Sequence, residues 1–380
     1  MNDAIDDGND FAGLIPRILD LALAIQQIPA PTFSEQQRGA FVKEQFQAEG
    51  LSEVSSDELG DVYARLPGEG ELPPLVISAH LDTVFPAQTN LDARREQGRI
   101  FGPGIGDNSI GVAGLFGLLW ALRQRWGDAP VLPGDIWFVA NVGEEGLGDL
   151  CGMTAVVDRF GDRPLAYLVL EGMALGQIYH RALGVQRYRI RVRTQGGHSW
   201  VDYGAPSAIH ELAALVTRLT GLPVPETPRS SLNVGVISGG TSINTIAPEA
   251  TIELDLRSEG RDALASLIRQ VETLTAAVNR VGVQATLEII GRRPSGEIPA
   301  THPLVNLARR NLEAQGLQPN LTIGSTDANI PLSRDLPAIC VGLSTGYGAH
   351  TVNEYVNIEP IGQGLNFLIA LVEGAFQDLG

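Results

Sequence analysis

Two histidines and several carboxylates stand in this sequence where metal ligands could gather. His80 ends an apolar, strand-like run, and His350 lies far along the chain in a glycine-containing turn. The carboxylates follow similar apolar runs or lie in the glycine-rich turns after them; they are Asp107, Glu144, Glu145 and Glu171. Imidazole and carboxylate are ligands that borderline divalent metals such as zinc prefer. Two histidines with three carboxylates can hold two ions when one carboxylate bridges, so the pattern predicts a two-metal hydrolase.

The composition is that of a globular protein with an acidic surface. Its 380 residues, 44% of them hydrophobic, suffice for two domains with separate cores. The formal net charge of -17 argues against nucleic acid as a partner, because phosphate binding is built on Lys and Arg. The acidic segment 1–7, and apolar runs shorter than the roughly 18 to 20 residues that span a bilayer, favour a cytoplasmic protein without a membrane partner. Cys151 and Cys340 are predicted to be buried free thiols.

Strand-length apolar runs alternate with helical periodicity in the first part of the chain. This alternation predicts an α/β domain with a mixed, largely parallel sheet flanked by helices. Helices are predicted at Phe11 to Ile28, Glu35 to Gln47 and Ile110 to Arg125, the last apolar on nearly every face and therefore buried. Strands are predicted at Val62 to Leu66, Pro74 to Ala79, Ile136 to Val142 and Leu165 to Leu170. Ser34 and Gln37 form the pattern of a capping box before the second helix.

A different pattern begins near residue 183. From Val185 to Thr194 apolar and charged residues alternate, which is typical of a half-exposed antiparallel strand. The elements that follow are a helix at Pro206 to Thr220, strands at Leu232 to Ser238 and Thr251 to Arg257, a helix at Asp262 to Val281 and a strand at Val283 to Ile290. The order βαββαβ predicts a ferredoxin-like α+β domain over residues 183–292, inserted into a catalytic domain made of residues 1–182 and 293–380.

The alternation of strand-length apolar runs with helical periodicity resumes after residue 292. It predicts a helix at Pro303 to Gln315, a strand at Ala338 to Gly342 and a helix at Gly362 to Leu379. His350 therefore belongs to the same discontinuous domain as His80.

A series of short motifs runs through both domains. They are His80-Leu81-Asp82-Thr83, Gly102 to Asn108, Gly143-Glu144-Glu145-Gly146, Gly197-His198-Ser199, Asn244-Thr245-Ile246, Asp255-Leu256-Arg257 and His350 to Glu354. Each motif alone is weak, but in this order, between about Ile28 and Ile358, they resemble the M20 family of metallopeptidases, which includes glutamate carboxypeptidases, aminoacylases and desuccinylases. The resemblance implies a zinc-exopeptidase-like catalytic domain with an inserted lid.

The resemblance also implies a metal-binding role for five residues. His80 and Glu171 would hold one ion. Glu145 and His350 would hold the other, with Asp107 as the bridge. Zinc is the first expectation for both ions, and cobalt or manganese are alternatives.

Two further carboxylates would assist without binding metal. By resemblance, Glu144 would act as general base toward the nucleophilic water and pass the proton to the leaving amine. Asp82 would accept the free ring N–H of His80 and fix its tautomer. Asn108 stands where relatives commonly carry a second aspartate, and the resemblance implies a cis peptide between Asp107 and Asn108.

Three candidate residues lie in the predicted lid. By resemblance, His198 would reach into the partner's active site in a homodimer formed through the lid and would hold the oxyanion; a polar residue in a surface turn is the alternative. Asn244 and Arg257 would grip the substrate, because a guanidinium suits a carboxylate. A structural salt bridge is the alternative for Arg257.

Other features carry less information. The run Gly102 to Gly106 could cradle a phosphate, but it lacks the Lys-Ser/Thr of a P-loop, so we expect it to present Asp107 at a helix start. Asp327 is a candidate for shaping the pocket near His350. His180, His210 and His302 lie outside the motifs, and the last two read as scaffold or surface residues.

The sequence therefore predicts a zinc-dependent hydrolase of small amides that bear a free carboxylate, either peptides or N-acyl amino acids. Glu171, in place of the aspartate of many di- and tripeptidases in the family, favours the carboxypeptidase and acylase side. An aminopeptidase or tripeptidase on the same metal frame is one alternative. A catalytically silent protein that binds small molecules is another.

Overall fold

The computed structural model describes residues 11–127 and 132–380. The chain divides into two compact units: Met1–Arg181 with Glu297–Gly380, and Ala182–Gly296. The first boundary falls next to the predicted one, and the second falls a few residues beyond it. The second unit is thus one continuous segment inserted into the sequence of the first unit.

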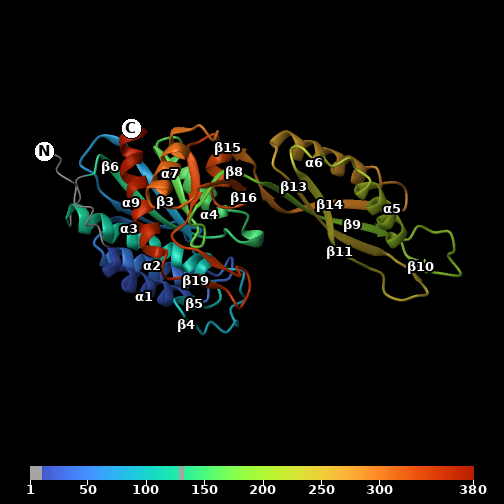
Figure 1. Ribbon diagram of the computed structural model, residues 1–380. Coiled ribbons are helices and arrows are strands. Elements are labelled where there is room, and N and C mark those ends of the chain that lie inside the picture. The colour runs from blue at the N-terminus through green and yellow to red at the C-terminus, as the bar shows by residue number, and fades with distance from the viewer. Residues whose placement is uncertain (1–10, 128–131) are drawn as a thin grey trace. The chain divides into compact units, whose positions relative to one another are not determined.

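The first unit is built on a mixed sheet whose central strands are parallel (Figure 1). In the described residues the order is β1-β2-β6-β3-β7-β17-β8-β15, and β16 pairs with β8. The strands are β1 (Ser52–Ser56), β2 (Val62–Leu66), β3 (Leu72–His80), β6 (Gly134–Asn141), β7 (Ala166–Leu170), β8 (Gln177–Ala182), β15 (Gly296–Glu297), β16 (Asn320–Gly324) and β17 (Ala338–Val341). Strands β6, β3, β7 and β17 run parallel and are almost wholly buried, as their continuous apolar runs predict.

Helices cover both faces of this sheet. They are α1 (Ile15–Gln26), α2 (Gln36–Ala48), α3 (Ile110–Trp126), α7 (Pro303–Ala314) and α9 (Ile361–Asp378) on one face, and α4 (Cys151–Phe160) and α8 (Asn329–Ser333) on the other. Because neighbouring side chains of a strand point to opposite faces, Phe138 stacks on Phe46 of α2, whereas Trp137 packs edge-on against Phe160 of α4. The mixed, largely parallel α/β sheet flanked by helices is confirmed.

Helix α3 runs through the middle of the first unit. All residues from Ile110 to Leu122 are buried, as the sequence predicts. By length and mean hydropathy the stretch Ile105–Trp126 could cross a membrane, contrary to the expectation from the sequence, but 94% of its most apolar window is buried inside the protein. Such burial is typical of a core helix.

Some predicted bounds are wrong. The helix expected from Phe11 to Ile28 divides into a short 3-10 helix, η1 (Phe11–Leu14), and α1. The helix expected to reach Val281 ends at Ala276. Helix α4 and several short strands were not predicted; these strands are β4 (Arg94–Glu96), β5 (Arg99–Phe101), β18 (Gly346–Tyr347) and β19 (Tyr355–Asn357), which form a small sheet.

The capping box predicted before α2 does not form. The helix begins at Gln36, and its N-cap residue Glu35 makes no side-chain cap bond. The Glu35 carboxylate instead accepts hydrogen bonds from the backbone N–H groups of Phe33 and Gly143. It therefore links the start of α2 to the turn that follows β6.

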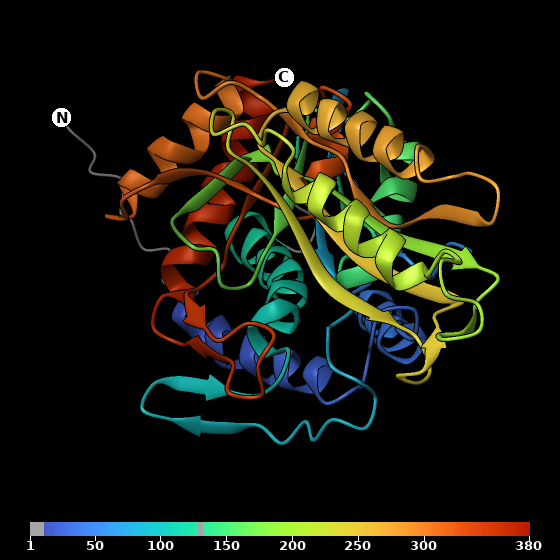
Figure 2. The ribbon, with the colours of Figure 1, turned by 90° about the vertical axis from the view of Figure 1, so that its right-hand side faces the viewer.

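The second unit has the βαββαβ element order and an antiparallel sheet β11-β13-β9-β14. Its elements are β9 (Gly184–Thr194), α5 (Ala208–Thr220), β11 (Ser230–Gly239), β13 (Glu249–Ser258), α6 (Arg261–Ala276) and β14 (Val283–Arg293). Helices α5 and α6 lie side by side on one face of the sheet, over a core of aliphatic side chains (Figure 2). On the other face Arg187 and Arg189 of β9 pair with Asp255 and Glu253, which explains the alternating pattern.

Candidate metal centre

The predicted metal ligands lie where parallel strands end. His80 is the last residue of β3. The neighbouring strand β6 leads into Glu144 and Glu145, and β7 leads directly into Glu171. Because parallel strands have their carboxyl ends at one edge of the sheet, segments distant in sequence converge there. Asp107 joins them from the segment η2 (Ile105–Ser109), which precedes α3.

His80, Asp107 and Glu171 form a first ligand group. His80 Nε2 lies 3.1 Å from Asp107 Oδ1 and 3.7 Å from Glu171 Oε2. One candidate ligand atom from each of the three residues lies within 4.8 Å of the others. The His80 side chain is only 1% exposed, and the two carboxylates are 17% exposed. The group is therefore nearly enclosed.

Asp107, Glu145 and His350 form a second ligand group. His350 Nε2 lies 3.2 Å from Asp107 Oδ2 and 3.1 Å from Glu145 Oε1. Asp107 thus presents one carboxylate oxygen to His80 and the other to His350, which is the arrangement of a bridging ligand. His350 is 55% exposed, so the second group opens to solvent.

The donors of both groups suit a divalent metal ion. Each group offers one imidazole nitrogen and carboxylate oxygens from two residues, a set that leaves a coordination position open, as in catalytic zinc sites. Carboxylates gathered at so small a distance in a mostly buried place repel one another unless cations neutralise them. The residues present therefore fit two ions that share Asp107.

The pKa shifts in the two ligand groups also fit the binding of cations. Burial alone would lower the pKa of His80, but the nearby carboxylates of Glu171 and Asp107 raise it well above its usual value. Hydrogen bonds to Asp107 and Glu145 raise the pKa of His350 to about 10. Burial opposes ionisation of Asp107, yet its bonds to both histidines lower its pKa. The raised histidine pKa values favour protonated imidazoles beside these carboxylates, and a metal ion would compete with those protons.

The Asp82 carboxylate lies beside His80 and also has a second role that the sequence did not reveal. His80 Nδ1 lies 3.0 Å from the backbone oxygen of Asp82 and 3.5 Å from its carboxylate, so the backbone carbonyl is the nearer acceptor. The fully buried carboxylate accepts the backbone N–H groups of Glu144 and Glu145, each at 2.9 Å, and the hydroxyl of Thr32. Asp82 thereby orients the histidine with its backbone and holds the Glu144–Glu145 turn with its side chain.

A glycine-flanked turn after β6 carries the adjacent residues Glu144 and Glu145. Gly143 and Gly146 flank it with φ values of 67° and 55°, which favour glycine. Glu145 faces His350, and its neighbour Glu144 is 5% exposed. A Cβ on Gly143 would lie 2.4 Å from the sulfur of Cys151, which packs beneath the turn. Cys151 is half-buried rather than buried as predicted, whereas Cys340 is buried.

The segment that carries Asp107 is held by a residue whose role the sequence did not reveal. The fully buried carboxylate of Glu354 accepts the backbone N–H groups of Gly104, Gly106 and Asp107. Burial raises the pKa of Glu354 to about 7. The peptide between Asp107 and Asn108 is cis, as predicted. The glycine-rich run thus presents Asp107 just ahead of α3.

Asp327 lies behind the site. It is fully buried, and its Oδ2 accepts a hydrogen bond from Asn141, the last residue of β6, at 2.7 Å. Burial raises the pKa of Asp327 to about 7. Its contact supports the strand end that leads to Glu144, and its role in shaping the pocket near His350 stays a prediction.

Residues 76–374 match peptidase family M20/M25/M40. The chain belongs to this family. It is therefore a hydrolase of the peptidase type, and the resemblance read from the motifs is confirmed.

Relatives of this M20 peptidase include proteins of similar length. The chain is 22% identical over 375 residues to the uncharacterized protein YqjE of Bacillus subtilis, covering 94% of this chain and 98% of that one. It is 24% identical over 343 residues to a probable carboxypeptidase of Arthroderma otae, covering 82% and 72%.

Solved structures share its fold. A tripeptidase of Staphylococcus aureus has a TM-score of 0.81 at 22% identity, covering 96% of this chain and 99% of that one. A dinuclear metal binding peptidase of the M20 family from Bacillus subtilis has a TM-score of 0.72 at 16% identity, covering 96% and 99%.

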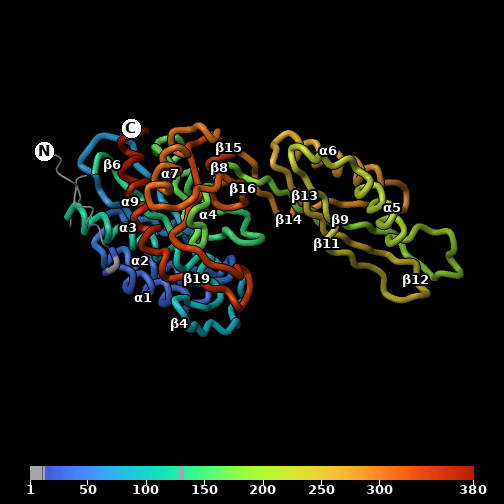
Figure 3. The backbone as a smooth tube through the Cα atoms, viewed as in Figure 1, coloured from blue at the N-terminus to red at the C-terminus, as the bar shows by residue number. Residues whose placement is uncertain are grey.

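The second unit of this M20 peptidase carries the remaining candidates. His198 lies exposed in the short strand β10 (Gly197–His198), and its Nδ1 accepts backbone N–H groups from Trp200 and Val201. The loop with Asn244 lies beside it, because β10 pairs with β12 (Thr245–Ile246), and both loops reach the same end of the unit (Figure 3). Arg257 donates to Asp255 at 2.7 Å, the structural salt bridge that the sequence left open.

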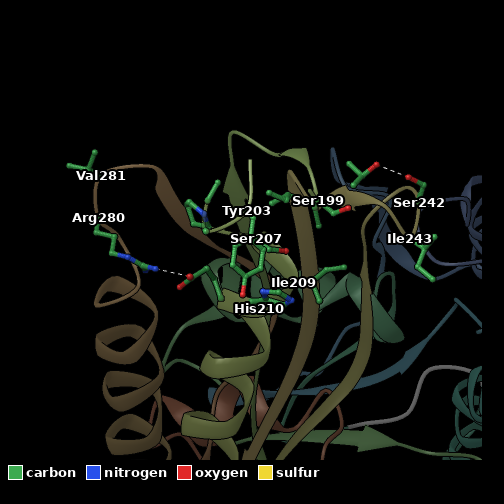
Figure 4. A pocket seen from close by; sticks show the side chains of 16 residues that line it. Ser199, Tyr203, Ser207, Ile209, His210, Ser242, Ile243, Arg280 and Val281 are labelled. Carbon is green, nitrogen blue, oxygen red and sulfur yellow. Dashed lines mark hydrogen bonds and ion pairs between the residues drawn. The ribbon is translucent and has the colours of Figure 1, made fainter. Parts of the chain in front are cut away.

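The other histidines have structural surroundings. His180 is buried with Nδ1 2.7 Å from the backbone oxygen of Ile298, and His302 caps α7 by accepting the N–H of Leu304. His210 of α5 is exposed and lines a pocket of about 920 Å³ in the second unit, which also includes Tyr203, Ile243 and Arg280 (Figure 4). The sequence did not predict this pocket, because segments distant in the chain form it together.

Proposed function

We propose that this M20 peptidase is a two-metal hydrolase, with zinc as the expected metal, that cleaves amide bonds of small peptides or N-acyl amino acids bearing a free carboxylate. The observation that carries the proposal is the position of Asp107, one oxygen of which faces His80 while the other faces His350. Two bound ions would acidify a shared water and polarise the scissile carbonyl. His80 and Glu171 would hold one ion, and Glu145 and His350 the other.

The side chains around this centre have distinct tasks in the proposal. Glu144 takes the proton of the nucleophilic water and delivers it to the leaving amine. Asp82 fixes the backbone from which Glu144 and Glu145 project. In a dimer, His198 of one copy donates to the developing oxyanion in the partner's site, and Asn244 and Arg257 bind the substrate.

The choice of substrate rests on several indications. Relatives named as probable carboxypeptidases favour a substrate with a free carboxylate, as does Glu171. The similar tripeptidase structure favours the second candidate, an aminopeptidase or tripeptidase. Paired substrates decide between them: blocking the carboxylate abolishes cleavage by the first enzyme, and blocking the amine abolishes cleavage by the second.

We further propose that the protein is cytoplasmic and that it forms a homodimer through the second unit. Strand β11 is an edge of its sheet in the described residues, and its Val236 and Ile237 are 51% and 64% exposed. An exposed apolar edge strand is suited to pairing with a second copy. Sedimentation of the wild type and of a Val236→Lys variant tests this: the variant becomes monomeric, whereas a monomeric wild type contradicts the dimer.

The test of the function is metal content per chain by elemental mass spectrometry, together with cleavage of dipeptides and N-acyl amino acids before and after chelation. We expect nearly two ions per chain and cleavage that chelation removes and metal restores. Protein that binds no metal after reloading with zinc, cobalt or manganese, and cleaves none of these substrates, would instead be a silent binding protein.

A further inference from the structure

Asn108 makes a pair of hydrogen bonds that enclose Glu171. Its Nδ2 donates to the backbone oxygen of Leu170 at 2.8 Å, and its Oδ1 accepts the backbone N–H of Gly172 at 2.9 Å. The side chain is fully buried. One amide therefore holds the peptide groups on both sides of a candidate ligand.

The surrounding backbone leaves little freedom for this arrangement to change. A Cβ on Gly111 would lie 1.9 Å from Asn108 Oδ1, and a Cβ on Gly172 would lie 2.3 Å from the backbone oxygen of Gly106. The N–H of Glu171 itself donates to Val341 of β17. With Asn108 in place, the backbone from Leu170 to Gly172 is fixed by hydrogen bonds at each residue.

The chemistry of the two bonds requires an amide. One partner is an acceptor and the other a donor, and asparagine offers both functions in one small planar group. An ionised aspartate of the same shape could still accept from Gly172, but its second oxygen would face the carbonyl oxygen of Leu170. That leaves a buried carbonyl without a donor beside a new negative charge. The residue that departs from the common family pattern is thus matched to its surroundings.

We propose that Asn108 is a positioning residue that sets the first ligand group by fixing Glu171, and that it acts on that group selectively. The selectivity follows because the side-chain bonds of Asn108 go only to the segment of Glu171, whereas Glu145 and His350 stand on other segments. The segment of the shared ligand Asp107 is held by Glu354. The proposal rests on the two-metal function proposed above and assigns one metal-binding step to one supporting side chain.

The test is zinc titration of the metal-free protein by calorimetry, with cobalt absorption spectra as a second readout. Asn108→Asp and Asn108→Ala are each expected to weaken one binding step by about 10- to 100-fold, the range for groups that orient metal ligands. Glu171→Gln identifies that step, and His350→Ala identifies the other. In the cobalt-loaded proteins, the Asn108 variants should change the same absorption band that Glu171→Gln changes.

A matched control is available in the second unit. Asn279 also donates to a backbone carbonyl and accepts a backbone N–H, both of Ala285, but it belongs to the second unit, which carries none of the proposed metal ligands. Asn279→Asp makes the same chemical change and is expected to leave both binding steps unchanged.

The outcomes separate the two proposals. A wild type that binds fewer than two ions refutes the two-metal function itself. A wild type that binds two ions, with Asn108 variants that lose both steps equally or neither, overturns the selective role of Asn108. Loss of fold in both the Asp and the Ala variant, by circular dichroism, overturns it too, because Asn108 is then a general structural residue.

Discussion

The candidate residues of the two units differ in how they are held. In the first unit, ligand-bearing segments are fixed by buried side chains that bond to backbone groups, such as Asp82 and Glu354. In the second unit, His198 and Arg257 are exposed and bond to residues close by in sequence or on their own sheet.

This difference indicates that the candidate residues of the two units act in different ways. The candidate ligand groups of the first unit are already assembled, so the proposed ions would bind without rearranging the protein. The residues of the second unit have no comparable cluster among those that the structure describes, so their proposed roles depend on substrate or a partner. Substitutions in the first unit should therefore change metal binding, and those in the second should change turnover or substrate affinity alone.

The largest effect is expected for Glu144. Glu144→Gln removes the proposed base while keeping its size, and should lower kcat by about 10²- to 10⁴-fold, the usual contribution of general base catalysis. Metal content should stay at the wild-type value. Glu145→Gln, one residue along, is the matched control and should lose metal from the second ligand group. Full activity in Glu144→Gln would refute the assignment of the base.

His198 tests the second unit. His198→Ala should lower kcat by about 10²- to 10³-fold, as expected for loss of one oxyanion donor, with metal content unchanged. His210→Ala, at another exposed histidine of the same unit, is the control and should leave kcat unaltered. Mixing His198→Ala with Glu144→Gln should restore part of the activity if His198 serves the partner's site. Unchanged turnover in His198→Ala would make it an ordinary surface residue.

The sequence predicted the part of the fold that has long patterns. Continuous apolar runs identified the central parallel strands, and alternation identified β9, because burial on two faces or one leaves these signatures. The short strands near His350 were missed, since two or three residues carry no periodicity. Helix α4 was also missed; its ten residues follow a glycine-rich turn and contain polar positions.

The site was predictable in its ligands but not in its supports. His80, Glu171 and the other ligand candidates stand at strand ends in recognisable motifs, and the structure brings them together. Glu354 and Glu35 hold backbone N–H groups far away in sequence. Such a contact leaves no local pattern, because any buried carboxylate near the turn could make it. The bonds that the Asp82 carboxylate accepts from Glu144 and Glu145 were missed for the same reason.

Asp82 tests whether these supports matter. Asp82→Asn removes one acceptor from the turn with Glu144 and Glu145, and should weaken metal binding by about 10- to 100-fold. Asp57 is a matched control, because its carboxylate likewise accepts backbone N–H groups, those of residues 59 to 61. Asp57→Asn should leave the zinc affinity unchanged. Equal affinities in Asp82→Asn and the wild type would show that the turn holds its shape without this carboxylate.

Arg257 should show a smaller effect, on substrate affinity. If its guanidinium binds the substrate carboxylate, Arg257→Ala should raise KM by about tenfold or more, as expected for loss of a hydrogen bond to a charged group. Arg187 is the control, because it pairs with the same Asp255 at 2.9 Å. Arg187→Ala should leave KM unchanged. Equal KM values in both variants would favour the purely structural salt bridge.

The smallest effect on activity is expected for Asp61, a buried carboxyl group that supports the Glu144 turn and lowers the stability of the fold at neutral pH. Asp61 is fully buried and accepts the N–H of Val142, just before the Glu144 turn, at 2.8 Å. Burial raises its pKa from 3.8 to about 8. The folded protein therefore keeps a proton that the unfolded chain releases above about pH 4, so stability falls as pH rises from about 4 to about 8.

Asp61→Asn should keep the hydrogen bond from Val142 and remove this dependence on pH. Between pH 5 and 7.5, the free energy of unfolding from urea titrations should fall less steeply in the variant, by up to about 1.4 kcal/mol per pH unit, the slope of one proton. Parallel slopes in the two proteins would mean that Asp61 is ionised in the fold. A flatter dependence of the unfolding free energy on pH, with normal zinc binding, would show that buried Asp61 lowers the stability of the first unit near neutral pH. The wild type would then keep a carboxyl group there because the N–H of Val142 needs an acceptor.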